Sequence, residues 1–223
     1  MMEVAVQPRG GAVVQSSEVG MGVTGRSDGR NRRAAETRRK ILAAAKAMIV
    51  ETSTAPTVVA VAKRADVSVR SVFQHFGDVE SLFVTVTDSV RGDLVVPPPT
   101  PTSGPLSARI TSVVDNLAQL FDKIVPLRVA AGQFANHPAL IERARASKQE
   151  LRDATVKAFE PEFASLDEAA REQLADAIGA ALSLEAWIVL RRRDGMSIDQ
   201  AKGVWQLTLT ALMEHGFAPA ATE

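Results

Sequence analysis

The stretch "ADVSVRSVFQHFGDVESL", residues 65–82, decides how the N-terminal part of this chain folds. Asp66 lies where a turn is expected, Ser68 can cap a short helix over roughly residues 68–75, and Asp78 can cap the next helix, to about Arg91. A helix of two turns is barely stable by itself. The pattern therefore predicts a short helix that its neighbours hold in place, crowded with polar side chains on one face.

Two helices are expected before this one. Thr57 can cap a helix to about Arg64, and the apolar residues between Ala34 and Ile49 recur at helical spacing. The segment "ETSTAP" separates the two helices. Two helices joined by a turn of three or four residues form a helix-turn-helix, in which the second helix enters the DNA major groove. A short connecting helix in any α-helical protein is the alternative interpretation of this pattern.

The remaining sequence is also helical, so we expect an all-α fold. The proline-rich "VVPPPTPTSGP" marks a domain boundary near residue 95. Pro138 suits the start of a helix to about residue 160, and "SLDE" resembles a capping box that starts a long helix ending near Arg193. Ser197 and Gln200 form a second capping box, before a last helix to about His215. The expected organisation is a disordered basic arm over 1–33, a DNA-binding domain over 34–94 and a helical domain over 95–223.

Composition and charge narrow the function further. The 223 residues include no cysteine, and the three histidines lack metal-ligand spacing, so no metal or cofactor is expected. Residues 1–92 hold 13 basic residues against 9 acidic ones, although the whole chain is neutral, which suggests a contact with a polyanion. No apolar run is long enough for a membrane span and no secretory signal is visible, so a cytoplasmic protein without a membrane partner is expected.

The run from "TRRKILAAAKAMI" through "TVVAVAKRADVSVRSVFQHFGDVESLF" resembles the N-terminal domain of the TetR family of transcriptional regulators. The resemblance covers about 50 residues without a gap, and the matching positions are Ile41, Leu42, Ala45, Thr57, Val61, Ala62, Ala65, Val67, Ser68, Phe73, Phe76, Glu80 and Leu82. It implies an N-terminal three-helix DNA-binding domain, followed by a helical domain that binds a small molecule and dimerises. The function it implies is a repressor that a hydrophobic or amphipathic ligand releases from a palindromic operator in double-stranded DNA.

Several positions depart from the family pattern. Asp66 replaces the usual turn glycine, which asparagine and aspartate can do because they tolerate the left-handed conformation. Val69 and Val79 occupy positions where the family often has lysine, so charge must come from Arg70, Lys63 and the arginine-rich segment before Ile41. The candidate DNA-binding residues are Thr57, Lys63, Ser68, Arg70, Ser71, Phe73, Gln74 and His75, with Phe73 equally compatible with a half-buried core position.

The C-terminal helices carry the other candidate sites. Possible ligand-lining residues are Phe121, Val125, Phe134 and Trp187, although apolar residues at helical spacing are more often core. By the resemblance, the last two long helices form the homodimer interface, with Ile178, Leu182, Val204, Trp205, Thr208 and Leu212 as candidates, and an intrachain core is the alternative. Because the sequence has no catalytic motif, an enzyme is not expected. A helical protein-interaction adaptor that does not bind DNA specifically is the alternative function.

Overall fold

The computed structural model describes residues 24–93 and 100–215, with the side chains of residues 24–28 and 215 left out, and every regular element in these ranges is a helix. The chain forms two compact units, residues 1–37 and 38–223. The first unit contributes the start of α1, where the Thr37 hydroxyl donates to the Arg33 carbonyl at 3.0 Å. The expected all-α fold is confirmed.

Four helices form the N-terminal part: α1 (Thr24–Thr52), α2 (Val58–Ala65), α3 (Val69–Phe76) and α4 (Val79–Asp93). Residues 24–33, expected in the disordered arm, are instead the first turns of α1, because Gly29 does not interrupt this polar part of the helix. The rest of the expected arm, residues 1–23, lies outside the described residues.

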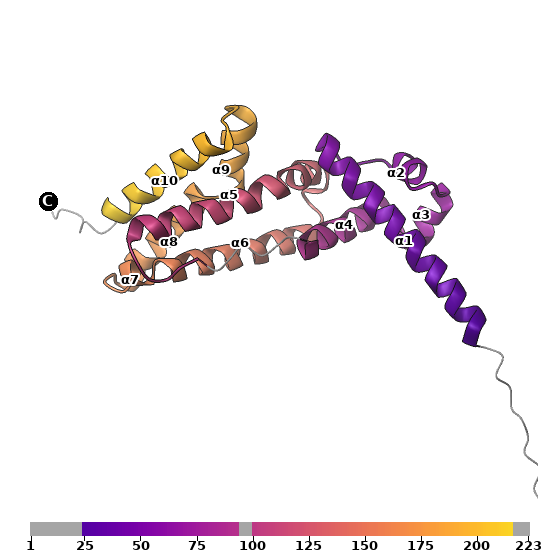
Figure 1. Ribbon diagram of the computed structural model, residues 1–223, viewed down its shortest axis with the longest axis horizontal. Coiled ribbons are helices and arrows are strands. Elements are labelled where there is room, and N and C mark those ends of the chain that lie inside the picture. The colour runs from indigo at the N-terminus through magenta and orange to yellow at the C-terminus, as the bar shows by residue number, and fades with distance from the viewer. Residues whose placement is uncertain (1–23, 94–99, 216–223) are drawn as a thin grey trace, which may run out of the picture. The chain divides into compact units, whose positions relative to one another are not determined.

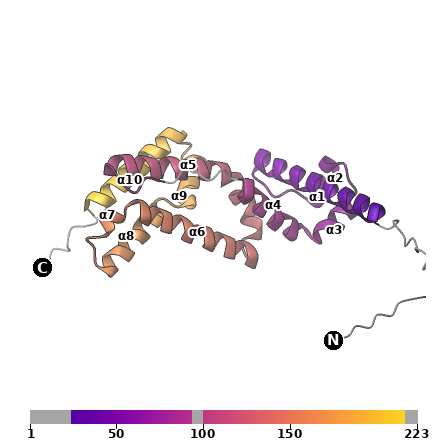
Figure 2. The same ribbon diagram turned by 60° about the horizontal axis from the view of Figure 1, so that its bottom comes forward.

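The C-terminal part begins with the long helices α5 (Leu106–Ala130) and α6 (Pro138–Ala158), which pack against each other (Figure 1). A 3₁₀ turn, η1 (Ala131–Phe134), joins them, and Pro138 is in the first turn of α6 as expected. After these come α7 (Glu160–Phe163), α8 (Glu168–Ala181), α9 (Leu184–Ile188), the π-helical turn η2 (Val189–Arg193) and α10 (Ile198–His215). Helix α10 packs against both α5 and α8, as the second view shows (Figure 2).

Among the described residues of 38–223, buried apolar side chains form two separate cores. One core lies between α5, α6, α8, α9 and α10 and contains Phe121, Phe159, Trp187 and Trp205. The other joins α1–α4, but the end of α5 and the start of α6 also pack against it, through Ala130, Phe134 and Leu140. The N-terminal core is therefore completed by residues from beyond the proline-rich boundary, which the sequence analysis did not predict.

Two helix boundaries differ from the expected ones. Asp167, not Ser165, caps α8: its carboxylate accepts from the Ala170 amide at 2.9 Å, because a charged acceptor suits a helix N-terminus better than a hydroxyl. The long helix expected to run to Arg193 is interrupted, because the Ser183 hydroxyl accepts from the Ala186 amide at 3.1 Å and starts α9. The second capping box is confirmed by hydrogen bonds in both directions between Ser197 and Gln200.

One helical stretch, Glu168–Arg193, is long and apolar enough to cross a membrane by length and composition alone. The expectation that no run reaches this length was therefore wrong. Leu174, Ile178 and Trp187 of this stretch pack in the C-terminal core, and the core helix of a soluble protein passes the same test. These three side chains are buried, although only 28% of the apolar window is buried inside the described part of the chain.

Candidate DNA-binding surface

The α2–turn–α3 segment is defined by capping at both helix starts. The Thr57 hydroxyl accepts from the Ala60 amide at 3.2 Å, and the Ser68 hydroxyl accepts from the Ser71 amide at 3.0 Å. Between them, Asp66 ends α2 in the left-handed conformation, with φ 55° and ψ 51°. The Val67 amide donates to the Ala62 carbonyl at 3.0 Å, which closes the end of α2. The short turn that the sequence predicted is therefore present, with aspartate in the position where glycine is usual.

Helices α2 and α3 each have one buried face, so the opposite face of each helix lies at the surface. Val61, Ala62 and Ala65 of α2 are buried, as are Val72 and Phe76 of α3. Small alanines allow α2 and α3 to pack closely. At the end of α3 the chain turns at Gly77 with φ 78°, a conformation that favours glycine. Ser81 then donates its backbone amide to Asp78 at 2.6 Å and α4 begins.

Arg38 of α1 also contacts this segment, which the sequence analysis did not predict. Its guanidinium lies 4.5 Å from the centroid of the Phe76 ring, within the range of a cation–π contact. The contact holds a cation of α1 beside the end of α3. The run of basic residues predicts a charged helix face, but it does not show which arginine stacks on an aromatic ring.

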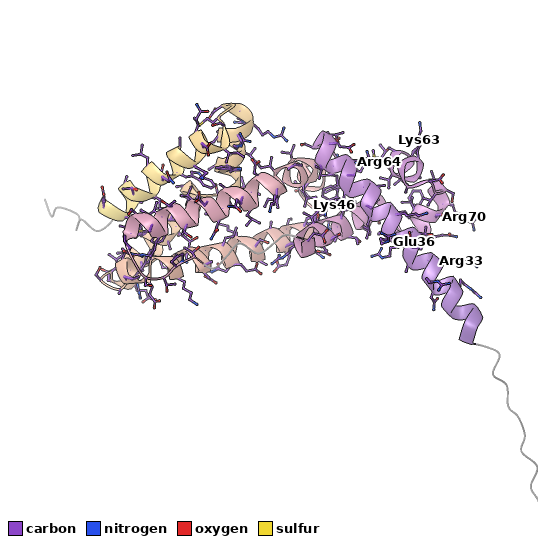
Figure 3. All side chains as sticks on the ribbon, viewed as in Figure 1. Arg33, Glu36, Lys46, Lys63, Arg64 and Arg70 are labelled. Carbon is purple, nitrogen blue, oxygen red and sulfur yellow. The ribbon has the colours of Figure 1, made fainter. Side chains whose placement is uncertain are left out.

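Most candidate DNA-binding residues lie at the surface. Exposed side chains are those of Thr57, Lys63, Ser68, Arg70, Phe73 and Gln74, whereas Ser71 and His75 are partly buried. Phe73 is 48% exposed, so of the two positions considered for it, the surface position is the one found. Lys63 extends from α2 and Arg70 from α3 (Figure 3).

Two nearby basic residues are engaged in ion pairs. Both terminal nitrogens of Arg64 donate to the Glu51 carboxylate at 2.6 Å, and this hydrogen bonding lowers the pKa of Glu51 and raises that of Arg64. Lys46 donates to Asp93 at 2.6 Å. For Arg70 and Lys63, no such contact is found within the described residues. Both side chains are therefore available to contact a polyanion.

The candidate ligand residues do not form a single group. Phe121 packs edge-on against Trp205, with ring centroids 5.8 Å apart, and Trp187 lies 4.6 Å from Trp205. Val125 belongs to the same core. Phe134 instead packs against Phe83 of α4, at 4.8 Å, in the N-terminal core. Sequence spacing placed Phe134 with the others because it cannot show that the α5–α6 connection turns toward the DNA-binding segment.

The candidate dimer residues divide into two groups. Ile178, Leu182 and Trp205 are buried within the chain's own core, the position that the intrachain alternative expects. Thr208 and Leu212 are partly buried, and Val204 is exposed. Leu207, which the sequence analysis did not select, is 73% exposed. Helix α10 is apolar on most of its circumference, so its sequence alone could not distinguish the core face from the outer one.

Helices α2 and α3 are both capped, and each has one buried face and one exposed face. Two such helices joined by a tight turn form a helix-turn-helix. The chain is thus a DNA-binding protein of the helix-turn-helix class. Residues 41–86 match the family described as bacterial regulatory proteins, tetR family, and this part of the chain is a TetR-family DNA-binding domain. A comparison with curated proteins finds no match. The chain is a DNA-binding transcriptional regulator.

Proposed function

We propose that this regulator is a homodimeric repressor that reads a palindromic operator with α3 and leaves it when a small molecule binds. The observation that supports this most directly is the exposed face of α3, where Arg70 and Gln74 lie one turn apart beside the Ser68 cap. Arginine can bind guanine and glutamine can bind adenine through two hydrogen bonds in the major groove. Thr57, Ser71 and His75 would contact the DNA backbone, with Lys63 supplying charge.

Arg70 provides the test of this orientation. Replacing Arg70 with alanine should weaken binding to the operator by about 1 to 3 kcal/mol, and by less on random DNA, if the side chain contacts a base edge. Replacing Lys63 with alanine is the matched control, because loss of a phosphate contact weakens binding to all sequences alike. Binding would be measured by fluorescence anisotropy with an operator selected from random duplexes. Equal losses for Arg70→Ala on both DNAs would assign Arg70 to a phosphate instead.

The dimer proposal uses the surface formed by α8 and α10. Val204 and Leu207 expose apolar side chains on α10, and the exposed Gly203 of α10 and Ala180 of α8 are small enough for close helix approach. A two-fold axis through such a surface pairs it with itself, as homodimers require. One α3 reads only a few base pairs, so two copies spaced about one DNA turn apart, or a multiple of it, are needed to specify an operator.

Leu207→Glu tests the dimer because it would place a charge in the proposed interface. We expect the natural chain to be a dimer at micromolar concentration, and the variant to be a monomer that binds the operator weakly. Light scattering measures the mass, and fluorescence anisotropy measures the operator affinity of the same samples. Ile141→Glu is the matched control, since Ile141 is also exposed but lies on α6. A variant at Leu207 that stays dimeric would remove α10 from the interface, and a monomeric natural chain would refute the dimer.

The effector proposal uses the C-terminal core. The indole N–H groups of Trp187 and Trp205 are buried without a hydrogen-bond partner within the described residues, and each such group costs roughly 1 to 3 kcal/mol. A hydrophobic or amphipathic ligand with an acceptor atom would satisfy them. The hollow beside Ala118 and Lys202, of about 250 Å³, is lined by residues of α5 and α10 and by neither tryptophan, so a ligand that reaches the indoles would require these two helices to separate.

Tryptophan emission gives a direct assay for the effector. Trp187 and Trp205 are the two tryptophans of the chain, which has no tyrosine, so emission reports on the C-terminal core alone. A compound that releases the protein from its operator should also change this emission. A releasing compound that leaves the emission unchanged would place the effector outside this core. For such a regulator we also propose a cytoplasmic location, where operator and effector meet.

A further inference from the structure

Two exposed apolar side chains lie in line on α3. Val69 is 38% exposed and Phe73 is 48% exposed, and residues four apart share one face of a helix. Beside them run Arg70 and Gln74, also four apart. Single exposed apolar residues are ordinary on protein surfaces. A pair in line on the helix that enters the groove, beside two base-reading side chains, is not explained by the buried core behind it.

The other residues of α3 fill the core or are hydrogen-bonded, which leaves the exposed parts of Val69 and Phe73 without a partner of their own kind in the core. Val72 and Phe76 fill the core, and the Ser71 hydroxyl shares a hydrogen bond of 2.8 Å with that of Ser68. Val69 and Phe73 cannot donate a hydrogen bond to a phosphate. Contact with the sugar–phosphate backbone would therefore give these side chains no hydrogen bond. Contact with an apolar group on a base edge would instead bury their apolar surface.

We infer that Val69 and Phe73 contact thymine 5-methyl groups and that the operator half-site contains thymines at these positions. The thymine methyl is the apolar group that the major groove presents, and aromatic and aliphatic side chains pack against it. Four residues of helix span roughly 6 Å, and stacked base pairs are about 3.4 Å apart. The two thymines should therefore lie about two base-pair steps apart, next to the bases that Arg70 and Gln74 read.

This inference rests on the proposed reading of an operator by α3, so its test begins with a duplex that the full-length protein selects from a random-sequence pool. Each thymine is then replaced by deoxyuridine in both half-sites, which removes the methyl and keeps the base pair. Burial of a methyl-sized group is worth about fourfold in affinity. Two half-sites therefore give a loss of roughly fifteenfold at each contacted thymine and none at the others.

Variants of the protein assign each methyl to its side chain. For Phe73→Ala, replacing one of the contacted thymines by deoxyuridine should no longer lower the affinity, and for Val69→Ala the same should hold at the other contacted thymine. In each variant the side chain that contacts the methyl group is already absent. Val59→Ala is the matched control: Val59 is exposed on α2, and this variant should keep both sensitivities. Equal thermal unfolding midpoints would show that all variants are folded.

The outcomes separate the inference from the function on which it rests. If no duplex is selected, the proposed operator reading fails. If the selected duplex binds equally well with every thymine replaced, or if Phe73→Ala weakens thymine and deoxyuridine duplexes by the same factor, the methyl contact is refuted while operator reading stands.

Discussion

Glu162→Ala tests the buried ion pair that joins α5 to the end of α6 and to α7. Arg109 is 4% exposed, and one of its terminal nitrogens donates to the Ala158 carbonyl at 2.9 Å and to Glu162 at 2.6 Å. The other terminal nitrogen donates to the second oxygen of Glu162. The guanidinium also lies 5.7 Å from the Phe159 ring centroid. Removing the carboxylate would leave a buried arginine without its counter-charge.

The expected cost is about 3 to 5 kcal/mol, because breaking one side of a buried ion pair leaves an uncompensated charge. This is a large part of the roughly 5 to 15 kcal/mol that stabilises a typical domain. The matched control is Glu142→Ala, since Glu142 and its partner Arg145 are both exposed, and its cost should stay below about 1 kcal/mol. Urea unfolding followed by tryptophan emission measures both variants. A loss below about 1 kcal/mol for Glu162→Ala would refute the reasoning.

The same pair predicts a dependence on pH. Hydrogen bonding from Arg109 holds the pKa of Glu162 below its usual value. The stability that this carboxylate contributes is therefore fully present above the usual pKa of a glutamate and is lost as the pH falls through the lowered value. Glu162→Gln cannot titrate, so its stability should decline less than that of the natural chain over this acidic range.

Three further outcomes follow from single contacts. Asp66→Gly should preserve or raise the thermal unfolding midpoint and Asp66→Ala should cost about 1 kcal/mol, because φ is 55° at this position; equal stabilities would contradict the turn. Glu51→Gln should release Arg64 and steepen the salt dependence of binding to random DNA by about one charge; an unchanged slope would keep Arg64 away from DNA. Ser197→Ala should lower stability by about 1 kcal/mol through loss of the α10 cap, measured by urea unfolding, and a neutral result would contradict it.

The N-terminal helices could be predicted because their signals are local. Thr57 and Ser68 each cap a helix by a hydrogen bond three residues ahead, and both assignments are confirmed. Asp66 adopts the left-handed conformation that its place between two helices required. At Ser165 the same logic failed, because Asp167 offers a charged acceptor two residues later. Local signals therefore predict that a helix starts in a segment, but they do not show which of two nearby polar residues caps it.

The candidate sites of the C-terminal part depend on tertiary packing, which helical spacing does not encode. The core of α10 contains Trp205 and Leu209, and Leu207 between them points outward, although all three are large and apolar. Phe134 was grouped with Phe121 by type and spacing, yet the two lie in different cores. Arg109 gave no signal in the sequence, because a buried arginine is recognised only by the carboxylate that packs against it.

Sequence-specific DNA binding is the claim on which the rest depends. The measurement is the affinity of the full-length protein for a selected operator relative to a random duplex of equal length, titrated side by side at one physiological salt concentration. Regulators that read base edges prefer their site by about 10³-fold or more, and we expect a ratio in that range that falls when Arg70 is replaced by alanine. Equal affinity for both duplexes would contradict the account.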